Sequence, residues 1–183
     1  FDIASNQVFT HIRLNIFPDG GVARLRIYGE VQIQLQKSDQ ILDLLALENG
    51  GRVIAYSDAH YGHPRNLINP GRGINMGDGW ETKRRREPGF DWCVLALGQA
   101  GKIEKIEIDT AHFKGNFPAQ VSIQAVYVED ATDPQLIPQS MFWPFLLNAQ
   151  DMQMDHIHDY VADILKHEKI SHIRVNMIPD GGI

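Results

Sequence analysis

Acidic side chains and a histidine that can move protons gather in two polar segments of the chain. The first segment covers residues 57–86 and the second covers residues 109–118. Carboxylates and imidazoles are common general acids and bases in enzymes. The catalytic candidates are Asp78, Glu81, Asp109 and His112. Structural roles are the alternative for two of them, because Asp78 precedes a glycine and could start a turn, and Asp109 could bond the backbone that follows its strand.

Two histidines and an aspartate of the first segment could instead bind a metal ion. His60 and His63 are three residues apart, and Asp58 precedes them. Zinc and manganese accept such ligands, and the ion would polarise a carbonyl group or activate water. The sequence does not determine further ligands, although His112 or Glu81 could complete the site after folding. No cofactor is required by the sequence, and a divalent metal, manganese or zinc, at Asp58, His60 and His63 is the one to test.

Short strands are expected to position both polar segments. Alternating or continuous apolar residues predict strands at 52–56, 90–97, 102–109, 119–129 and 141–147. Residues 41–47 predict a short strand or a helical turn, and residues 57–79 and 130–139 predict loops. Residues 154–165 could include a strand, but their helical spacing favours a helix. Many short strands and few helices indicate a β-sandwich, with the polar segments at strand ends.

One motif occurs twice, near the two ends of the chain. Residues 10–21 read THIRLNIFPDGG and residues 171–182 read SHIRVNMIPDGG, an offset of 161 positions (172 − 11). The alternating part predicts a strand and Pro-Asp-Gly-Gly predicts a tight turn, so each copy favours a β-hairpin over a catalytic loop. Such a period suits a whole domain, and we expect the end of one repeat followed by most of another. Residues 22–29 would then be displaced, or would fill the place of the strand expected after Ile183.

The composition narrows the function classes. The chain has 183 residues, of which 43% are hydrophobic, as is typical of a globular protein with a substantial core. Its formal net charge of −6 argues against a nucleic-acid partner. Cys93 is the only cysteine, and its place within an apolar strand predicts burial rather than a nucleophilic role. No apolar stretch is long enough to span a membrane, so we expect no membrane partner and a cytoplasmic location, with the peroxisome as the alternative.

The two polar segments resemble those of one enzyme family. Residues 77–86, GDGWETKRRR, and residues 109–118, DTAHFKGNFP, together with the repeated HIRLNIFPDGG, resemble the allantoicase family over essentially the whole chain. The resemblance implies an all-β fold of two tandem repeats, each a jelly-roll β-sandwich of the galactose-binding-like type. Residues 1–29 would be the end of the first repeat, residues 30–43 a linker, and residues 44–183 the second repeat without its last strand.

The resemblance also implies hydrolysis of allantoate to ureidoglycolate and urea in purine degradation. Allantoate carries a carboxylate and two ureido groups on one carbon. Arginine or lysine suits the carboxylate, and the ureido groups need hydrogen-bond donors and acceptors. The substrate-binding candidates are Arg84, Arg85, Lys114, Asn116, Asn66 and Trp80, with Arg86 and Thr82 as further choices. Any single arginine could equally be a solvated surface residue, and Trp80 could belong to the core or to the pocket wall.

Two other functions stay open at this point. A β-sandwich can be a non-enzymatic module that binds a carbohydrate or another small ligand, because a fold does not determine a function. Such a module is expected to show exposed aromatic residues on a shallow face, rather than this concentration of charged residues. Alternatively, this repeat is structural and the chemistry belongs to the other repeat. For the enzyme we expect a homo-oligomer.

Overall fold

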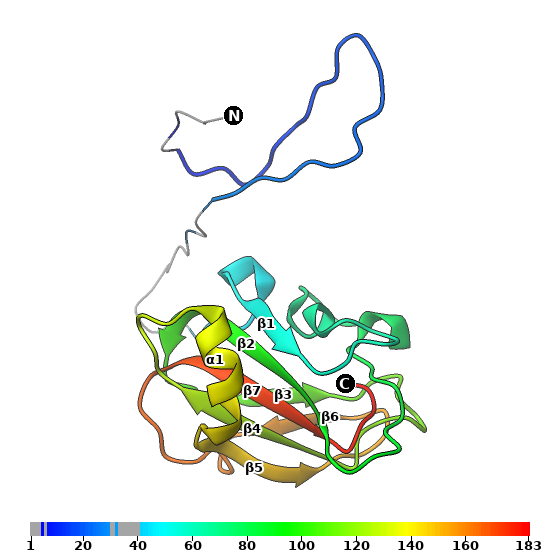
Figure 1. Cartoon of the computed structure of the whole chain (residues 1–183), viewed down its shortest axis with the longest axis vertical. Helices are drawn as coiled ribbons and strands as arrows, with labels where there is room; N and C mark the ends of the chain where they lie inside the picture. The colour runs from blue at the N-terminus through cyan, green and yellow to red at the C-terminus, as the bar shows by residue number, and fades with distance from the viewer. Residues whose placement is uncertain (1–4, 6, 30–31, 33–40) are drawn as a thin grey trace.

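Two antiparallel sheets form a β-sandwich. The computed structural model describes residue 5, residues 7–29, residue 32 and residues 41–183. The strands are β1 (Arg52–Tyr56), β2 (Asp91–Gly101), β3 (Ile106–Asp109), β4 (Gln120–Val126), β5 (Phe145–Asp151), β6 (Ile157–Tyr160) and β7 (Ile170–Ile178). One sheet has the order β1-β2-β7-β4-β5, and the other pairs β3 with β6 (Figure 1). The predicted all-β jelly-roll sandwich of the galactose-binding-like type is confirmed.

The main core lies between the two sheets. Alternate residues of a strand point to opposite faces, so one face of β2, β4 and β7 supplies the apolar layer. Val121 and Met177 have no exposed surface, and Ile108 and Tyr160 face them from the smaller sheet. Cys93 is fully buried in this core, as its sequence position predicted.

A short helix covers part of the outer face of the larger sheet. Helix α1 (Asp133–Gln139) continues into the 3-10 turn η4 (Ser140–Phe142), and Leu136 packs with Val94 and Trp143. Thr132 caps the helix in a reciprocal arrangement with Gln135. The prediction of a loop at residues 130–139 was therefore wrong, because one buried leucine and a capping box suffice to form two helical turns.

The helix favoured at residues 154–165 was also wrong. This region contains β6, whose Ile157 and His158 pair with Asp109 and Ile108 of β3. The buried His158 ring places Nδ1 3.1 Å from the carbonyl oxygen of Ile108. Pairing with a strand about 50 residues earlier decides this conformation, and local spacing does not contain that information.

The remaining differences from the predicted elements concern their boundaries. Residues 41–47 lead into a 3-10 turn, η1 (Leu47–Asn49), and β5 begins later than predicted because Met141 and Phe142 belong to η4. The predicted loop at 57–79 is irregular apart from η2 (Pro64–Ile68) and η3 (Met76–Asp78). No helix in the described part of the chain is long and apolar enough to cross a membrane.

The two copies of the repeated motif fold differently. The second copy forms β7, which lies between β2 and β4 in the centre of the larger sheet. Residues 7–29 contain no strand and extend away from the sandwich in Figure 1, so the predicted hairpin is wrong for the first copy. Residues 22–29 therefore do not fill the position that follows Ile183. Most of the predicted linker at 30–43 lies outside the described residues, and the predicted domain boundaries stay predictions.

Candidate functional site

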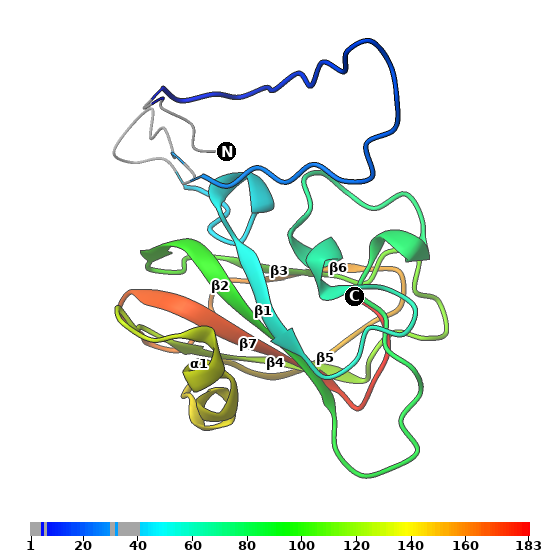
Figure 2. The same ribbon diagram turned by 45° about the horizontal axis from the view of Figure 1, so that its top comes forward.

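A cavity of about 430 Å³ opens where three parts of the chain meet. Its lining comes from Tyr61 and from residues within 81–85, 115–119 and 179–181. Figure 2 shows the C-terminus among the loops that follow β1. The cavity thus combines both predicted polar segments with the second copy of the repeated motif.

Backbone hydrogen bonds hold the C-terminal residues against the first polar segment. The N–H of Trp80 donates to the carbonyl oxygen of Ile183 at 2.8 Å, and the N–H of Ile183 donates back to Trp80 at 3.0 Å. The neighbouring Glu81 forms backbone bridges with Gly62 on one side and Gly182 on the other. The backbone of Glu81 is therefore fixed from two directions.

The side chain of Glu81 is oriented by Asn116. Both residues are partly buried and line the cavity, and the Asn116 amide donates a hydrogen bond to Oε1 of Glu81. The other oxygen, Oε2, accepts no hydrogen bond from the described residues, so it can accept one from water or a ligand. The structure brings together two predicted residues, one catalytic and one substrate-binding, and the pair can place and deprotonate a water molecule.

Two arginines supply positive charge to the same cavity. Arg84 is exposed, whereas Arg85 is partly buried and its Nη1 lies 3.0 Å from Oδ1 of Asp91. The backbone N–H of Arg85 donates to Oδ2 of Asp180 at 3.0 Å. Arg86 is exposed and does not line the cavity. Arg84 and Arg85 can therefore hold an anion beside the Glu81 carboxylate.

Asp180 was missed by the sequence reasoning, which assigned its motif to a hairpin alone. Asp180 belongs to the Pro-Asp-Gly-Gly turn and lines the cavity, and the next residue, Gly181, receives the Thr82 N–H on its carbonyl oxygen at 2.9 Å. A Cβ on Gly181 would lie 2.7 Å from the Asn116 carbonyl oxygen, so this turn packs tightly against the second polar segment. The position of this carboxylate directly after a predicted strand is the signal that could have identified Asp180 as a site residue. Tyr61 and Phe117 also line the cavity and were not predicted.

Three predicted residues hold the loop before Glu81 and do not line the cavity. Oδ2 of Asp78 accepts hydrogen bonds from the backbone of Ile74 and Asn75 at 2.9 and 3.2 Å, which makes Asp78 a capping residue. The Asn66 amide donates to backbone carbonyls of the same loop. Trp80 has no exposed surface and donates its indole N–H to the backbone, so it is a core residue and cannot contact a substrate directly.

Asp109 has a structural role at the end of β3. Its Oδ2 lies 2.8 Å from Nη1 of Arg72, and its Oδ1 accepts the N–H of Ala111 at 2.7 Å. The structural alternative for Asp109 is thus the one that the geometry supports, and Asp109 does not line the cavity.

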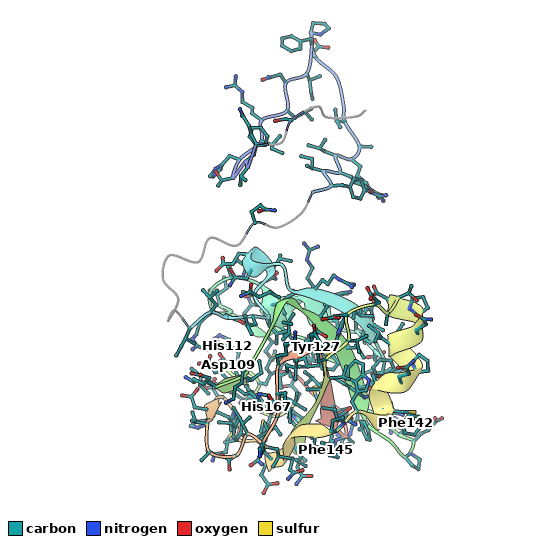
Figure 3. All side chains as sticks on the ribbon, turned by 90° about the vertical axis from the view of Figure 1, so that its left-hand side faces the viewer. Asp109, His112, Tyr127, Phe142, Phe145 and His167 are labelled. Carbon is teal, nitrogen blue, oxygen red and sulfur yellow. The ribbon has the colours of Figure 1, made fainter. Side chains whose placement is uncertain are left out.

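His112 and Lys114 contact Asp155, in the turn before β6, and do not line the cavity. Oδ1 of Asp155 accepts the backbone N–H of His112 at 2.7 Å, and Lys114 lies 3.6 Å from the same carboxylate. The hydrogen bond from His112 and the charge of Lys114 lower the pKa of Asp155. The His112 ring reaches the Gly73 carbonyl oxygen with Nε2 at 3.1 Å. Figure 3 shows His112 beside Asp109 at one edge of the sandwich.

The predicted metal ligands do not form a metal site. Oδ2 of Asp58 accepts the backbone N–H groups of His60 and Lys83 at 3.2 and 2.8 Å. Nδ1 of His63 accepts the backbone N–H of Arg65 at 3.0 Å, which occupies the lone pair that a metal would need. Among the residues that the structure describes, no group of three or more histidine, cysteine or acidic side chains could hold a metal ion. Asp58, His60 and His63 therefore do not come together as a group of three ligands, and a divalent metal in the protein stays a prediction.

Comparison with known protein families matches most of the chain to a family model. A family model described as "Allantoicase repeat" matches residues 1–32 and 42–183. A curated protein of Acinetobacter baylyi named "Probable allantoicase" is 85% identical over all 183 residues. A Burkholderia mallei protein named "Probable allantoicase 1" is 53% identical over 97% of the chain. The chain covers 55% and 53% of these two proteins, so it spans about half the length of the curated relatives it matches.

Solved structures lead to the same family. The crystal structure of allantoicase from Saccharomyces cerevisiae matches with a TM-score of 0.65 and 40% identity, over 77% of this chain and 40% of that one. The C-terminal domain of a Bacteroides fragilis chitobiase matches with a TM-score of 0.50 and 13% identity, over 72% of this chain and 85% of that one. The second likeness shows the fold alone.

Proposed function

The chain belongs to the allantoicase family, and on this premise we propose that the protein hydrolyses allantoate to ureidoglycolate and urea. The observation that carries the proposal for this part of the chain is a single cavity that holds Glu81, Asn116, Arg84 and Arg85. Four of the predicted functional residues, taken from both polar segments, meet there. Their chemistry matches the requirements of an anionic ureide.

The proposed reaction replaces one bond and moves one proton. The bond from the central carbon of allantoate to one ureido nitrogen breaks, and a bond from that carbon to a water oxygen forms. One hydrogen of the water stays on the new hydroxyl group, and the other ends on the departing urea nitrogen. A single carboxylate that accepts a proton and then returns it satisfies this balance. Oε2 of Glu81 can serve for that purpose, because it accepts no hydrogen bond from the described residues.

The other groups of the cavity bind and orient the substrate. Arg84 and Arg85 pair with the substrate carboxylate, for which a guanidinium offers parallel N–H donors. Asn116 keeps one Glu81 oxygen occupied and thereby directs the other toward the substrate. None of these steps involves a metal ion, because no group of three ligand side chains lies together among the described residues.

The carbohydrate-binding alternative has one observation in its favour and one against. Phe142 of η4 and Phe145 of β5 are exposed, and Figure 3 labels both. They border a hollow of about 450 Å³ on the outer face of the larger sheet. The floor of that hollow offers little to sugar hydroxyl groups, because the Asn176 amide already donates to Ser122 and Gln124. We therefore retain the hydrolase as the proposed function.

The test uses the full-length protein, allantoate and a urea assay. Glu81→Gln removes the proton acceptor but keeps the shape, and we expect turnover to fall by about 10²- to 10⁴-fold. Glu87→Gln is the matched control, because Glu87 is an exposed glutamate of the same loop that does not line the cavity. Wild-type turnover in Glu81→Gln would remove Glu81 from the mechanism, and no urea from the folded wild-type protein would refute the proposed function.

A chelator control addresses metal dependence separately. We expect the rate of urea release to be unchanged by a chelator, because no group of three ligand side chains lies together among the described residues of this repeat. Inactivation that added zinc or manganese reverses would place a metal elsewhere in the full-length protein. The homo-oligomer and the cytoplasmic or peroxisomal location stay predictions, which size-exclusion chromatography and cell fractionation can test.

A further inference from the structure

A buried carboxylate lies directly behind the cavity and outside its lining. Asp91 is the first residue of β2 and is 2% exposed. Its Oδ1 accepts hydrogen bonds from Nη1 of Arg85 at 3.0 Å and from the hydroxyl group of Ser57 at 2.9 Å. The Ser57 oxygen in turn accepts the Trp92 N–H at 2.9 Å, and the Asp91 N–H donates to the Pro179 carbonyl oxygen at 3.0 Å. The carboxylate is thus fixed at both its backbone and its side chain.

The contact between Asp91 and Arg85 leaves hydrogen-bonding groups unused. Oδ2 of Asp91 and Nε of Arg85 are both buried and have no hydrogen-bond partner among the described residues. A pair that served stability alone would be expected to use both donors of the guanidinium edge, because buried polar atoms without partners are costly. Buried polar atoms that lack a hydrogen-bond partner are concentrated at functional sites. The Asp91 carboxylate therefore holds the guanidinium through Nη1 alone and leaves its other donors without a partner among the described residues.

Two further features concern the backbone of Arg85 and the space around its guanidinium. Asp180 accepts its backbone N–H, and a Cβ on Gly89 would lie 3.1 Å from Nη2, so the absence of a side chain there leaves room for the guanidinium. Nη2 donates no hydrogen bond to the described residues, and the side chain of Arg85 is 28% exposed and lines the cavity. By contrast Arg84, which also lines the cavity, forms no ion pair within the described residues.

We propose that Asp91 is a positioning residue that aims the Arg85 guanidinium at the substrate carboxylate, with Ser57 holding Asp91 in place. Asp91 engages Nη1, so Nη2 stays available to the ligand. The ordering of a flexible arginine before the substrate arrives reduces the entropy lost on binding. The inference rests on the proposed function, because it concerns how the same cavity recognises the allantoate carboxylate.

A double-mutant cycle in the full-length enzyme tests the inference. We expect Asp91→Asn to raise the KM for allantoate about tenfold with little change in kcat, since a loosened arginine weakens ground-state binding. If Asp91 acts through Arg85, then adding Asp91→Asn to Arg85→Ala should raise KM no further than Arg85→Ala alone. Arg52→Ala is the matched control, because Arg52 forms an arginine–aspartate pair with Asp133 on the surface and does not line the cavity.

The outcomes separate the two proposals. A wild-type enzyme that releases no urea from allantoate refutes the proposed function. An active wild type in which Asp91→Asn lowers only the melting temperature, or in which the two substitutions raise KM independently, overturns the positioning role alone. Should Asp91→Asn fail to fold, Ser57→Ala decides the matter, because it keeps the ion pair and removes one support. A rise in KM of about threefold then supports the inference, and a wild-type KM overturns it.

Discussion

Replacing Gly182 by alanine should destabilise the junction that holds Glu81. A Cβ at Gly182 would lie 2.0 Å from Cε1 of Phe113, whereas ordinary contact begins at 3.4 Å, so one of the two must move by the difference of about 1.4 Å. The Phe113 ring is 2% exposed and also packs against Gly79, where a Cβ would lie 2.7 Å from it. The ring therefore has little room to retreat. Overpacking of this kind costs about 1–3 kcal/mol, and we expect a value near 3 kcal/mol.

The assay is urea-induced unfolding of the 183-residue chain followed by circular dichroism. Gly21→Ala is the control, because Gly21 occupies the corresponding position of the first motif copy and has nothing within 4 Å of its Cβ position. Its free energy of unfolding should stay within about 0.5 kcal/mol of wild type. Adding Phe113→Leu to Gly182→Ala should cost less than the sum of the two separate losses, since both changes act on one contact. An unchanged free energy of unfolding in Gly182→Ala would refute the packing argument.

Two further predictions concern titratable groups in the sandwich. Burial and the nearby charge of Arg52 lower the pKa of His172, so the folded state binds the proton less readily than the unfolded state. The stability that the neutral His172 contributes is present above the unfolded pKa of about 6.5 and is lost as the pH falls through the folded pKa. Between about pH 7.5 and pH 5, the His172→Gln variant should therefore lose less free energy of unfolding than the wild type. An equal loss in both proteins would contradict this prediction. Burial also raises the pKa of the Cys93 thiol, so a thiol reagent should label the chain only after denaturation, and rapid labelling of the native chain would show that Cys93 is accessible.

Periodicity predicted the strands of the larger sheet better than it predicted the smaller sheet. The apolar run at 90–97 and the alternation at 119–129 both became central strands, β2 and β4, because their patterns match burial on a sheet. The four residues of β6 have no pattern of that strength. Their conformation depends on hydrogen bonds to β3, which the local sequence does not reveal.

The sequence predicted only part of the candidate site. Glu81, Arg84, Arg85 and Asn116 were found by residue type and do line the cavity. Residue type could not separate them from Asp78 and His112, whose side chains bond nearby loops instead. That distinction depends on which direction each side chain takes after folding.

The repeated motif shows most directly what the sequence by itself determined. The sequence alone shows two copies of one pattern, the strand tendency of each, the tight turn and the family resemblance. In the second copy Ile173, Val175 and Met177 are at most 6% exposed. The corresponding Ile12 and Leu14 of the first copy are 61% and 50% exposed, in a segment without strands.

Only the tertiary structure decided the conformation of each copy. A strand needs neighbours to satisfy its backbone and to cover its apolar face, and β7 has them in β2 and β4. The same neighbours carry the turn of the second copy to the cavity, where Asp180 meets Arg85. The strand conformation of the second copy therefore depends on packing against β2 and β4, because those contacts supply the free energy that the local pattern lacks.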